Sequence, residues 1–292
     1  MNYQRPSELD EALTLLQATP HQVIAGATDV YPADANQQAW GQRPMLAREE
    51  EHFLDISGVA SLHQIRKHAA AIEIGAGVTW TQAIESDLPS WFDAVRLAAH
   101  EVGGKQIQNR GTIAGNLCNA SPAADGVPPL LALDAKVRLQ ALGRTREMSL
   151  EAFIVGNRKT ELRADELLTA IVIPVPKNTS HTTFLKLGAR RFLVISIAMV
   201  AARLDVQDGQ VATARLAVGA CGPVARRLQA LETRLVGQSI DALETTLTSS
   251  DLDVLTPIDD VRATAAYRWH AAQTLVARTL DELARTARDK PR

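Results

Sequence analysis

Residues 106–125, QIQNRGTIAGNLCNASPAAD, are the stretch of the chain that constrains its fold most strongly. Residues 112–116 combine small side chains with a hydroxyl and an amide, groups that both donate and accept hydrogen bonds. Polar groups that become buried need partners, and loops of this composition often have a ligand as that partner. The segment therefore indicates a ligand-binding loop. The alternative is a structural loop in which Asn116 and Asn119 only satisfy carbonyl groups of the turn.

Residues 24–29, IAGATD, form a second segment of the same kind. The brief apolar run at 22–25 predicts a buried strand that leads into a tight turn at Gly26. Small side chains at the end of a strand let backbone N–H groups approach a phosphate without steric interference. The segment fits a pyrophosphate cradle. The alternative is a turn whose small residues only permit close packing.

A third segment, residues 184–191, reads FLKLGARR and puts Lys186 on a predicted strand before two arginines. These cations would place positive charge near a flavin or an anionic nucleotide, although charged strand residues also occur simply as solvated side chains. Residues 75–77, GAG, begin like a dinucleotide-binding fingerprint but lack its third glycine. The chain contains neither a phosphate loop of the GxxxxGK[ST] type nor a GxSxG nucleophile elbow.

The charge pattern argues against nucleic acid as a partner. The formal net charge is −2 over 292 residues, and lysine and arginine are scattered rather than clustered. No apolar stretch approaches the roughly 20 residues that a membrane-spanning helix needs. The first residues also lack the basic start and apolar run of a secretory signal. We therefore expect a cytoplasmic protein without a membrane span.

Cysteine and histidine content limits the metal chemistry of the chain. Its two cysteines, Cys118 and Cys221, are too few for an iron–sulfur cluster, which usually takes four thiolates. The seven histidines show no HExxH or similar ligand spacing. The sequence predicts no metal site.

The first half of the chain reads as mixed α and β. Apolar spacing predicts a helix at 7–16 with Ser7 as N-cap, and apolar runs predict strands at 52–56 and 70–75. Further helices are expected at 79–85, capped by Thr79, and at 91–102. From residue 103 to 131, regular structure is expected to give way to loops.

The second half predicts a small sheet followed by helices. A strand at 170–174 ends at prolines, residues 177–180 resemble a linker, and we place a domain boundary near 178. Strands at 182–187, 195–204 and 211–219 fit an antiparallel sheet, with a turn at 207–209. Helices are expected over most of the chain from 224 onward.

Taken together, residues 25–29 and 106–125 are similar to the two flavin loops of the FAD-binding (medium) subunits of the molybdenum hydroxylases, the xanthine dehydrogenase and carbon monoxide dehydrogenase type. The resemblance extends through residues 186–196 and 256–262, so it spans nearly the whole chain. It implies an α+β fold: a vanillyl-alcohol-oxidase/PCMH-type FAD-binding domain over 1–177, with two α+β subdomains at about 1–57 and 58–177. A C-terminal domain of antiparallel sheet plus helices would follow at 178–292.

The resemblance also implies which residues bind FAD. The diphosphate would lie against Ala25, Gly26, Ala27, Thr28, Asp29 and Val30, and Thr112, Ala114, Gly115 and Asn116 would close on it. Ser121 and Asp125 match positions near the adenosine and ribityl parts, Leu168 an apolar contact, and Lys186 a position near the isoalloxazine ring. Val102 stands where some relatives carry an aromatic residue.

Two departures from the family pattern concern its glycines. The family commonly shows AGGT and TIGGN, whereas this chain has Ala27 and Ala114 at the second glycine position of each motif. A methyl group is accommodated there if φ stays negative. No catalytic side chain is expected, because the flavin carries the chemistry. Lys186 would raise its reduction potential by stabilising the anionic reduced form.

The function implied is electron transfer within a multi-subunit complex. A molybdopterin-binding large subunit would oxidise the substrate, and a small subunit with two [2Fe–2S] clusters would pass electrons to FAD on this chain, which then reduces NAD⁺ or another acceptor. The family suggests a dimer of three-subunit units, a heterohexamer. Two alternatives are a stand-alone FAD-dependent oxidase and a flavin-free assembly or binding module.

Overall fold

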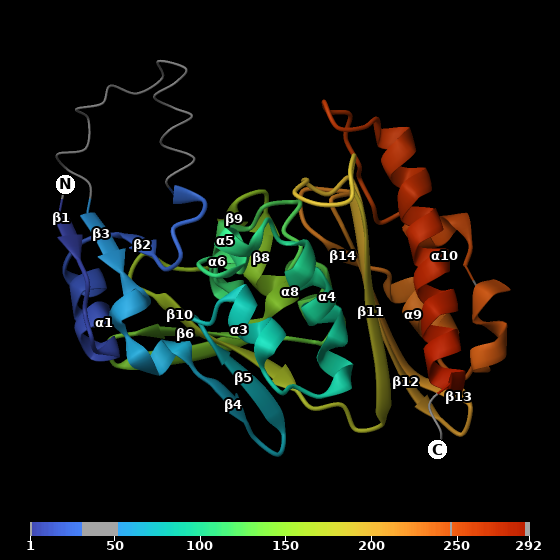
Figure 1. Cartoon of the computed structure of the whole chain (residues 1–292), viewed down its shortest axis with the longest axis horizontal. Coiled ribbons are helices and arrows are strands. Elements are labelled where there is room, and N and C mark those ends of the chain that lie inside the picture. Colours follow the sequence, from blue (N-terminus) through green and yellow to red (C-terminus); the bar gives the residue numbers. More distant parts are fainter. Residues whose placement is uncertain (1, 31–51, 246, 290–292) are drawn as a thin grey trace.

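The computed structural model describes residues 2–30, 52–245 and 247–289 (Figure 1). The chain begins with a three-stranded parallel sheet in the order β1-β3-β2, formed by β1 (Asn2–Gln4), β2 (Gln22–Ile24) and β3 (His52–Asp55). Helix α1 (Leu9–Ala18) buries Ala12, Leu13 and Leu16. The helix is predicted correctly, but its N-cap is Glu8 rather than Ser7, and no side chain caps it.

A five-stranded antiparallel sheet forms the second part, in the order β4-β5-β10-β6-β7. Its central strand, β10 (Leu167–Pro174), is an almost continuous apolar run and is buried on both faces. Neighbouring strands are β4 (Ile65–Lys67), β5 (Ala71–Gly75), β6 (Lys136–Ala141) and β7 (Arg144–Ser149). The small hairpin of β8 (Ile154–Gly156) and β9 (Lys159–Thr160) follows the short helix α8 (Leu150–Phe153).

Helix α3 (Trp80–Glu85) begins as predicted. The Thr79 hydroxyl accepts a hydrogen bond from the Gln82 N–H, and the Gln82 side-chain oxygen accepts one from the Thr79 N–H, which completes a capping box. Helix α4 (Asp93–Glu101) follows the short 3-10 turn at Ser90–Phe92.

The prediction of loops across residues 103–131 is wrong. The chain forms three short helices there: α5 (Lys105–Gln108), α6 (Ile113–Asn119) and α7 (Val127–Ala132). In α6 the Thr112 hydroxyl caps the helix, and Ile113 and Leu117 anchor it in the core. In α7 the two prolines lie in the first turn, where proline's missing N–H is tolerated.

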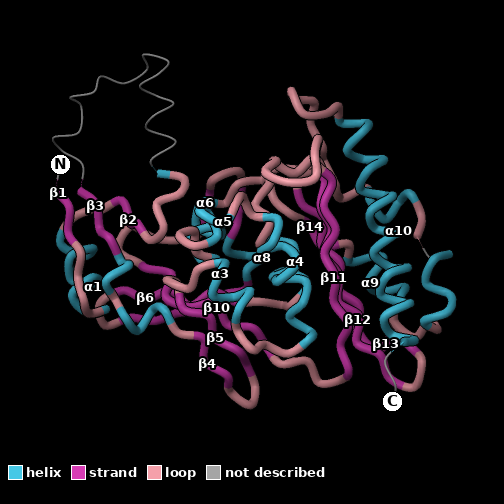
Figure 2. Tube along the Cα trace, viewed as in Figure 1, coloured by secondary structure: helices cyan, strands magenta, loops and turns pink. Residues whose placement is uncertain are grey.

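The last part of the chain is a four-stranded antiparallel sheet, and the helices of this part cover one of its faces. Its strands are β11 (Thr179–Leu187), β12 (Ala198–Gln207), β13 (Gln210–Gly219) and β14 (Arg226–Arg227). The predicted hairpin turn is confirmed, because Asp208 and Gly209 both have positive φ, 52° and 73°. Helices α9 (Gln229–Leu235) and α10 (Ala265–Asp289) pack on one face, while α4 and α7 pack on the other (Figure 2).

The predicted linker at 177–180 is shorter than expected, because β11 already includes Thr179 and Ser180. Between the first 177 residues and the last sheet lies a small apolar cluster, in which Ala94 and Ala98 of α4 meet Phe184 and Met199 of the sheet. The domain boundary near 178 stays a prediction.

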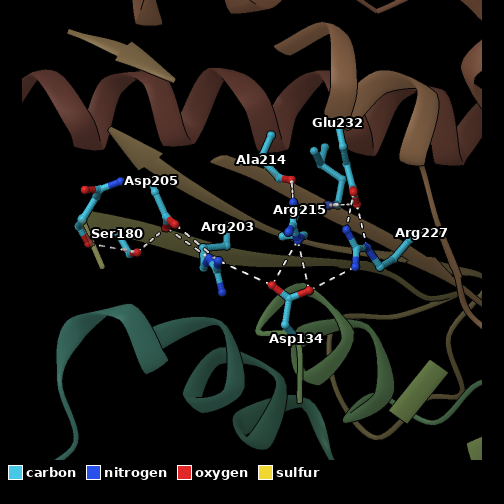
Figure 3. A network of polar contacts seen from close by, with 10 residues as sticks. Asp134, Ser180, Arg203, Asp205, Ala214, Arg215, Arg227 and Glu232 are labelled. Atoms are coloured by element: carbon cyan, nitrogen blue, oxygen red, sulfur yellow. Dashed lines mark hydrogen bonds and ion pairs between the residues drawn. The ribbon is translucent and has the colours of Figure 1, made fainter. Parts of the chain in front are cut away.

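A group of ion pairs also joins the two parts, centred on Asp134 in the loop after α7 (Figure 3). Its carboxylate accepts hydrogen bonds from Arg215 and Arg227, each at 3.0 Å, and Arg203 lies 3.5 Å away. Glu232 of α9 pairs with Arg227 in turn. One carboxylate of the first part therefore binds three guanidinium groups of the last sheet.

We predict that Asp134→Asn lowers the free energy of unfolding by about 2 kcal/mol, because hydrogen bonds to charged groups contribute roughly 1.5–3 kcal/mol each and are only partly replaced by an amide. Asparagine also tolerates the positive φ of 53° at this position. Urea unfolding measures the effect. The control is Asp241→Asn, which removes an exposed pair with Arg288 and should change stability by less than about 0.5 kcal/mol. Equal effects of the two substitutions would contradict the prediction.

Candidate cofactor site

A cavity of about 450 Å³ lies where the first loop, residues 24–30, faces the segment from Val102 to Asn119. Trp80, Ala76 and Leu167 complete its wall. The predicted site residues that line it are Ala25, Gly26, Ala27, Thr28, Asp29, Val30, Val102, Thr112, Ala114, Gly115, Asn116 and Leu168. The structure therefore brings together segments about 90 positions apart in the sequence, as the two-loop interpretation requires.

The two loops touch each other through their backbones at Gly26. A Cβ atom on this glycine would lie 1.9 Å from the carbonyl oxygen of Arg110 and 2.9 Å from the Cα of Gly111. No side chain fits into that space. Gly26 is therefore required for the close approach of the loops, and its role does not depend on a positive φ.

The first loop lines the cavity and contains backbone N–H groups without an acceptor among the described residues. The N–H groups of Gly26, Ala27, Thr28 and Asp29 donate to no acceptor among the described residues, whereas the Val30 N–H donates to the Ala27 carbonyl at 3.2 Å. Ala27 has φ +56°, in the left-handed region. Such turns gather successive N–H groups into a concavity that binds anions. The loop therefore fits a phosphate group.

The condition under which a methyl group is accommodated, a negative φ, is not met at Ala27. A left-handed conformation brings the Cβ of an L-residue too close to the following carbonyl, which costs roughly 1–2 kcal/mol. Strain of this kind persists where the surrounding structure holds it, often at ligand sites. Ala114, by contrast, lies within α6, so its methyl group causes no such strain.

The second loop is fixed by hydrogen bonds to the start of α3. The Trp80 N–H donates to the Gly111 carbonyl at 3.1 Å, and the Ile113 N–H donates to the Val78 carbonyl at 3.2 Å. The Thr112 hydroxyl accepts from the Gly115 N–H at 2.9 Å. These contacts leave the Ala114 N–H without an acceptor among the described residues. This part of the chain can donate to a second oxygen of an anion.

The two asparagines of the second loop have side-chain oxygens that accept hydrogen bonds within the chain, and Asn116 also has an amide NH₂ group that remains available. Asn116 Oδ1 accepts from the Gly126 N–H at 3.2 Å, and Asn119 Oδ1 accepts from the Arg158 side chain. Both side-chain oxygens therefore have structural partners, but these partners are donors and not the turn carbonyls of the structural alternative. The Asn116 amide NH₂, on the wall of the cavity, is still available as a donor.

Three predicted residues, Ser121, Asp125 and Lys186, do not line the cavity. Ser121 accepts from the Ala123 N–H at 3.3 Å in a turn. Lys186 Nζ donates to Asp125 Oδ2 at 2.7 Å and to the Glu101 carbonyl at 3.3 Å, and its side chain is only 5% exposed. Burial raises the pKa of the Asp125 carboxyl, while the Lys186 ammonium acts in the opposite direction.

Sequence reasoning missed several wall residues, chiefly Trp80, Ile107 and Cys118. Trp80 is almost fully buried and lies beside Gly111 and Gly126, where it supports the second loop from behind. An apolar side chain at a helix start carries no sequence signal for a ligand. Burial raises the pKa of the Cys118 thiol to about 12, so this thiol stays protonated at neutral pH.

Within residues 2–30, 52–245 and 247–289, no group of three or more His, Cys, Asp or Glu side chains is arranged to hold a metal ion. No helix in the described part of the chain has the length and apolar character needed to cross a membrane.

Family models match both parts of the chain. Residues 1–176 match the FAD binding domain in molybdopterin dehydrogenase, and residues 183–283 match the CO dehydrogenase flavoprotein C-terminal domain. The nicotinate dehydrogenase FAD-subunit of Eubacterium barkeri is 36% identical over 241 residues, which cover 80% of this chain and 78% of that protein. A putative xanthine dehydrogenase FAD-binding subunit of Escherichia coli is 29% identical and aligns over 99% of this chain and 98% of its own length.

Solved structures share the fold over the whole length. Carbon monoxide dehydrogenase from Hydrogenophaga pseudoflava matches with a TM-score of 0.86 and 24% identity, covering 97% of this chain and 96% of that one. Quinoline 2-oxidoreductase from Pseudomonas putida 86 matches with a TM-score of 0.84 and 25% identity, covering 98% of both chains.

The fold and the family models together define a flavoprotein with an FAD-binding domain. Within that class, the chain belongs to the FAD-subunit family of the molybdenum hydroxylases, the family of xanthine and carbon monoxide dehydrogenases.

We predict that Gly26→Ala weakens FAD binding by at least about 100-fold, or about 2.7 kcal/mol, because the new Cβ forces the two loops apart. Flavin fluorescence during titration of the flavin-free chain gives the dissociation constant. Gly156→Ala is the control, since its Cβ would meet only Lys159 side-chain atoms at 3.6 Å or more. Unchanged affinity in the Gly26 variant would contradict the contact between the loops.

Glycine substitutions at the two alanines should act in opposite directions. Ala27→Gly should stabilise the chain by about 0.5–1 kcal/mol, because relief of the left-handed strain exceeds the entropic cost of glycine. Ala114→Gly should destabilise it by about 1 kcal/mol, the usual penalty for glycine within a helix. Thermal unfolding of the flavin-free chain measures both, and a destabilised Ala27 variant would contradict the strain at this residue.

Proposed function

We propose that this chain is the electron-transfer subunit of a multi-subunit molybdenum hydroxylase. When bound, FAD supplies the chemistry: it accepts single electrons from [2Fe–2S] clusters of a small partner subunit and reduces NAD⁺ or another acceptor. The observation that carries the proposal is the cavity between two loops in which the N–H groups of residues 26–29 and of Ala114 have no acceptor among the described residues.

The need for partners follows from the side chains that this sequence provides. It contains two cysteines, whereas an iron–sulfur cluster usually takes four. Clusters and molybdopterin therefore belong to other subunits, a small [2Fe–2S] subunit and a large molybdopterin-binding subunit. By analogy with the family, the assembly is a dimer of three-subunit units, a heterohexamer, in the cytoplasm.

Names of relatives indicate the class of substrate that the large subunit would oxidise. Similar chains include a nicotine 6-hydroxylase medium subunit and a caffeine dehydrogenase subunit beta, whose names refer to N-heterocycles, and a glyceraldehyde dehydrogenase medium chain. We propose an aromatic N-heterocycle or an aldehyde as substrate of the complex. The substrate would bind on the large subunit and not on this chain.

Residues of this chain bind, orient and tune the flavin. The N–H groups of residues 26–29 and of Ala114 would hold the diphosphate, and Leu168 would provide an apolar contact. Ser121 and Asp125 would lie toward the adenosine and ribityl parts. Lys186 would act on the isoalloxazine ring through its charge, because a nearby cation stabilises the anionic reduced form.

Absorption spectra test the proposal. The chain purified alone should show flavin absorption with one FAD per chain and no iron–sulfur absorption. The complex purified with its partners should show both, and NADH added without oxygen should bleach the flavin band if NAD⁺ is the acceptor. A complex that lacks flavin, or that forms and turns over without this chain, would contradict the proposal.

A further inference from the structure

A chain of polar contacts lies behind the wall of the cavity and joins both parts of the molecule. Its centre is Asp125, whose Oδ2 accepts from Lys186 Nζ at 2.7 Å and whose Oδ1 accepts from Ser196 Oγ at 2.6 Å. Ser196 is fully buried, in the segment between β11 and β12. Each oxygen of this carboxylate thus has one donor from the C-terminal part.

This ion pair is connected to the cavity wall on both sides. Lys186 also donates to the carbonyl of Glu101, and the next residue, Val102, lines the cavity. Asp125 precedes Gly126, whose N–H is bound by the side chain of Asn116, another cavity residue. A change in net charge at the pair therefore acts on a ligand in the cavity through buried protein, where screening is weaker than in water.

Ser196 is itself held by a motif that the flavin loops do not include, residues 256–262. Arg262 Nη1 donates to the Ser196 carbonyl at 3.2 Å, and Asp260 accepts from Arg262 at 2.6 Å. Arg268, only 1% exposed, donates to the other Asp260 oxygen at 2.6 Å and to the Ile197 carbonyl at 2.7 Å. The carbonyl groups of Ser196 and of the next residue are therefore both held, which restricts the position of the Ser196 hydroxyl.

We propose that Ser196, held by Arg262 and Asp260, is a positioning residue that keeps Asp125 ionised against Lys186 and thereby sets the reduction potential of the flavin. This inference rests on the proposed function, since it requires FAD in the cavity. While Asp125 is ionised, its charge offsets that of Lys186. If Asp125 takes up a proton, the ammonium group is left uncompensated and stabilises the anionic reduced flavin.

The groups around Asp125 decide its ionisation. Burial raises the pKa of its carboxyl, the Lys186 ammonium and the Ser196 hydroxyl lower this pKa, and the Glu101 carboxylate of α4 raises it. Removal of the Ser196 hydroxyl takes away one of the groups that favour the ionised form. The neutral form then gains population, so Ser196→Ala should act in the same direction as Asp125→Asn.

The test measures the midpoint potential of bound FAD in the full-length chain. Ser196→Ala and Asp125→Asn should each shift the equilibrium at least tenfold toward reduced flavin, which is about 30 mV for a two-electron couple. Both shifts should vanish in a Lys186→Gln background, because burial without the ammonium group favours the neutral Asp125 carboxyl, so that neither substitution removes a charge. A purely structural role of Ser196 would not depend on Lys186 in this way.

A matched control is Ser180→Ala. Ser180 also donates to a buried aspartate, Asp205, but lies six residues before Lys186 on β11, about 20 Å away at the usual rise per strand residue. Its loss should leave the potential unchanged. If Ser196→Ala does not fold, Arg262→Gln is the second variant. It removes the hydrogen bond that the partly exposed Arg262 side chain donates to the Ser196 carbonyl, and it should shift the potential in the same direction.

The inference is overturned if Ser196→Ala binds one FAD at the wild-type potential, or if its shift persists without Lys186. Absence of FAD from the wild-type chain and its complex is a different result, because it contradicts the proposed function itself.

Discussion

The close contact between Gly26 and the Arg110 carbonyl is the constraint on which the rest of the site depends. It brings a loop that ends a parallel strand against a loop that caps α6, and the cavity lies between them. Neither loop forms the site alone, because each contributes only part of the set of free N–H groups. Backbone donors need no particular side chain, so most positions along the two loops are defined by small size rather than by charge.

The C-terminal sheet takes part in the site without lining the cavity. Asp134 binds three of its arginines, and Asp125 binds its Lys186 and Ser196. The first of these contacts lies partly exposed, and the second is buried directly behind the wall of the cavity. The contacts of Asp134 therefore stabilise the interface, whereas in our proposal the contacts of Asp125 at the same interface set the reduction potential of the flavin. This arrangement gives a physical reason for the sheet to accompany the FAD-binding domain in a single chain.

Sequence patterns predicted the features that depend on local chemistry. The helix cap at Thr79 and the turn at Asp208 and Gly209 follow from neighbouring residues, and both are present. Segments dominated by small residues are harder to interpret, because composition alone does not distinguish a loop from short helices. Helix α6 is such a short helix, and its Thr112 cap and its burial hold it in place. The left-handed conformation of Ala27 was also missed, because alanine usually avoids it and only contacts between distant segments enforce it.

The predicted residues of the two loops line one cavity, and their role in FAD binding stays a prediction. Ser121, Asp125 and Lys186 were assigned by resemblance, and the pairing of Asp125 with Lys186 depends on how the last sheet packs, which no local pattern reveals. Ser196 carried no signal of its own, since a serine beside apolar residues is common. Its importance emerges only from its contacts to Asp125 and Arg262.

Titration of the flavin-free chain with FAD, ADP and riboflavin tests the central claim most directly, because the three ligands separate recognition of the diphosphate from recognition of the ring. If the two loops bind the diphosphate, FAD binds with one equivalent per chain, ADP competes with it, and riboflavin binds at least about 100-fold more weakly, a difference of about 2.7 kcal/mol. Riboflavin binding as tight as that of FAD, or no binding of FAD at all, would contradict the account.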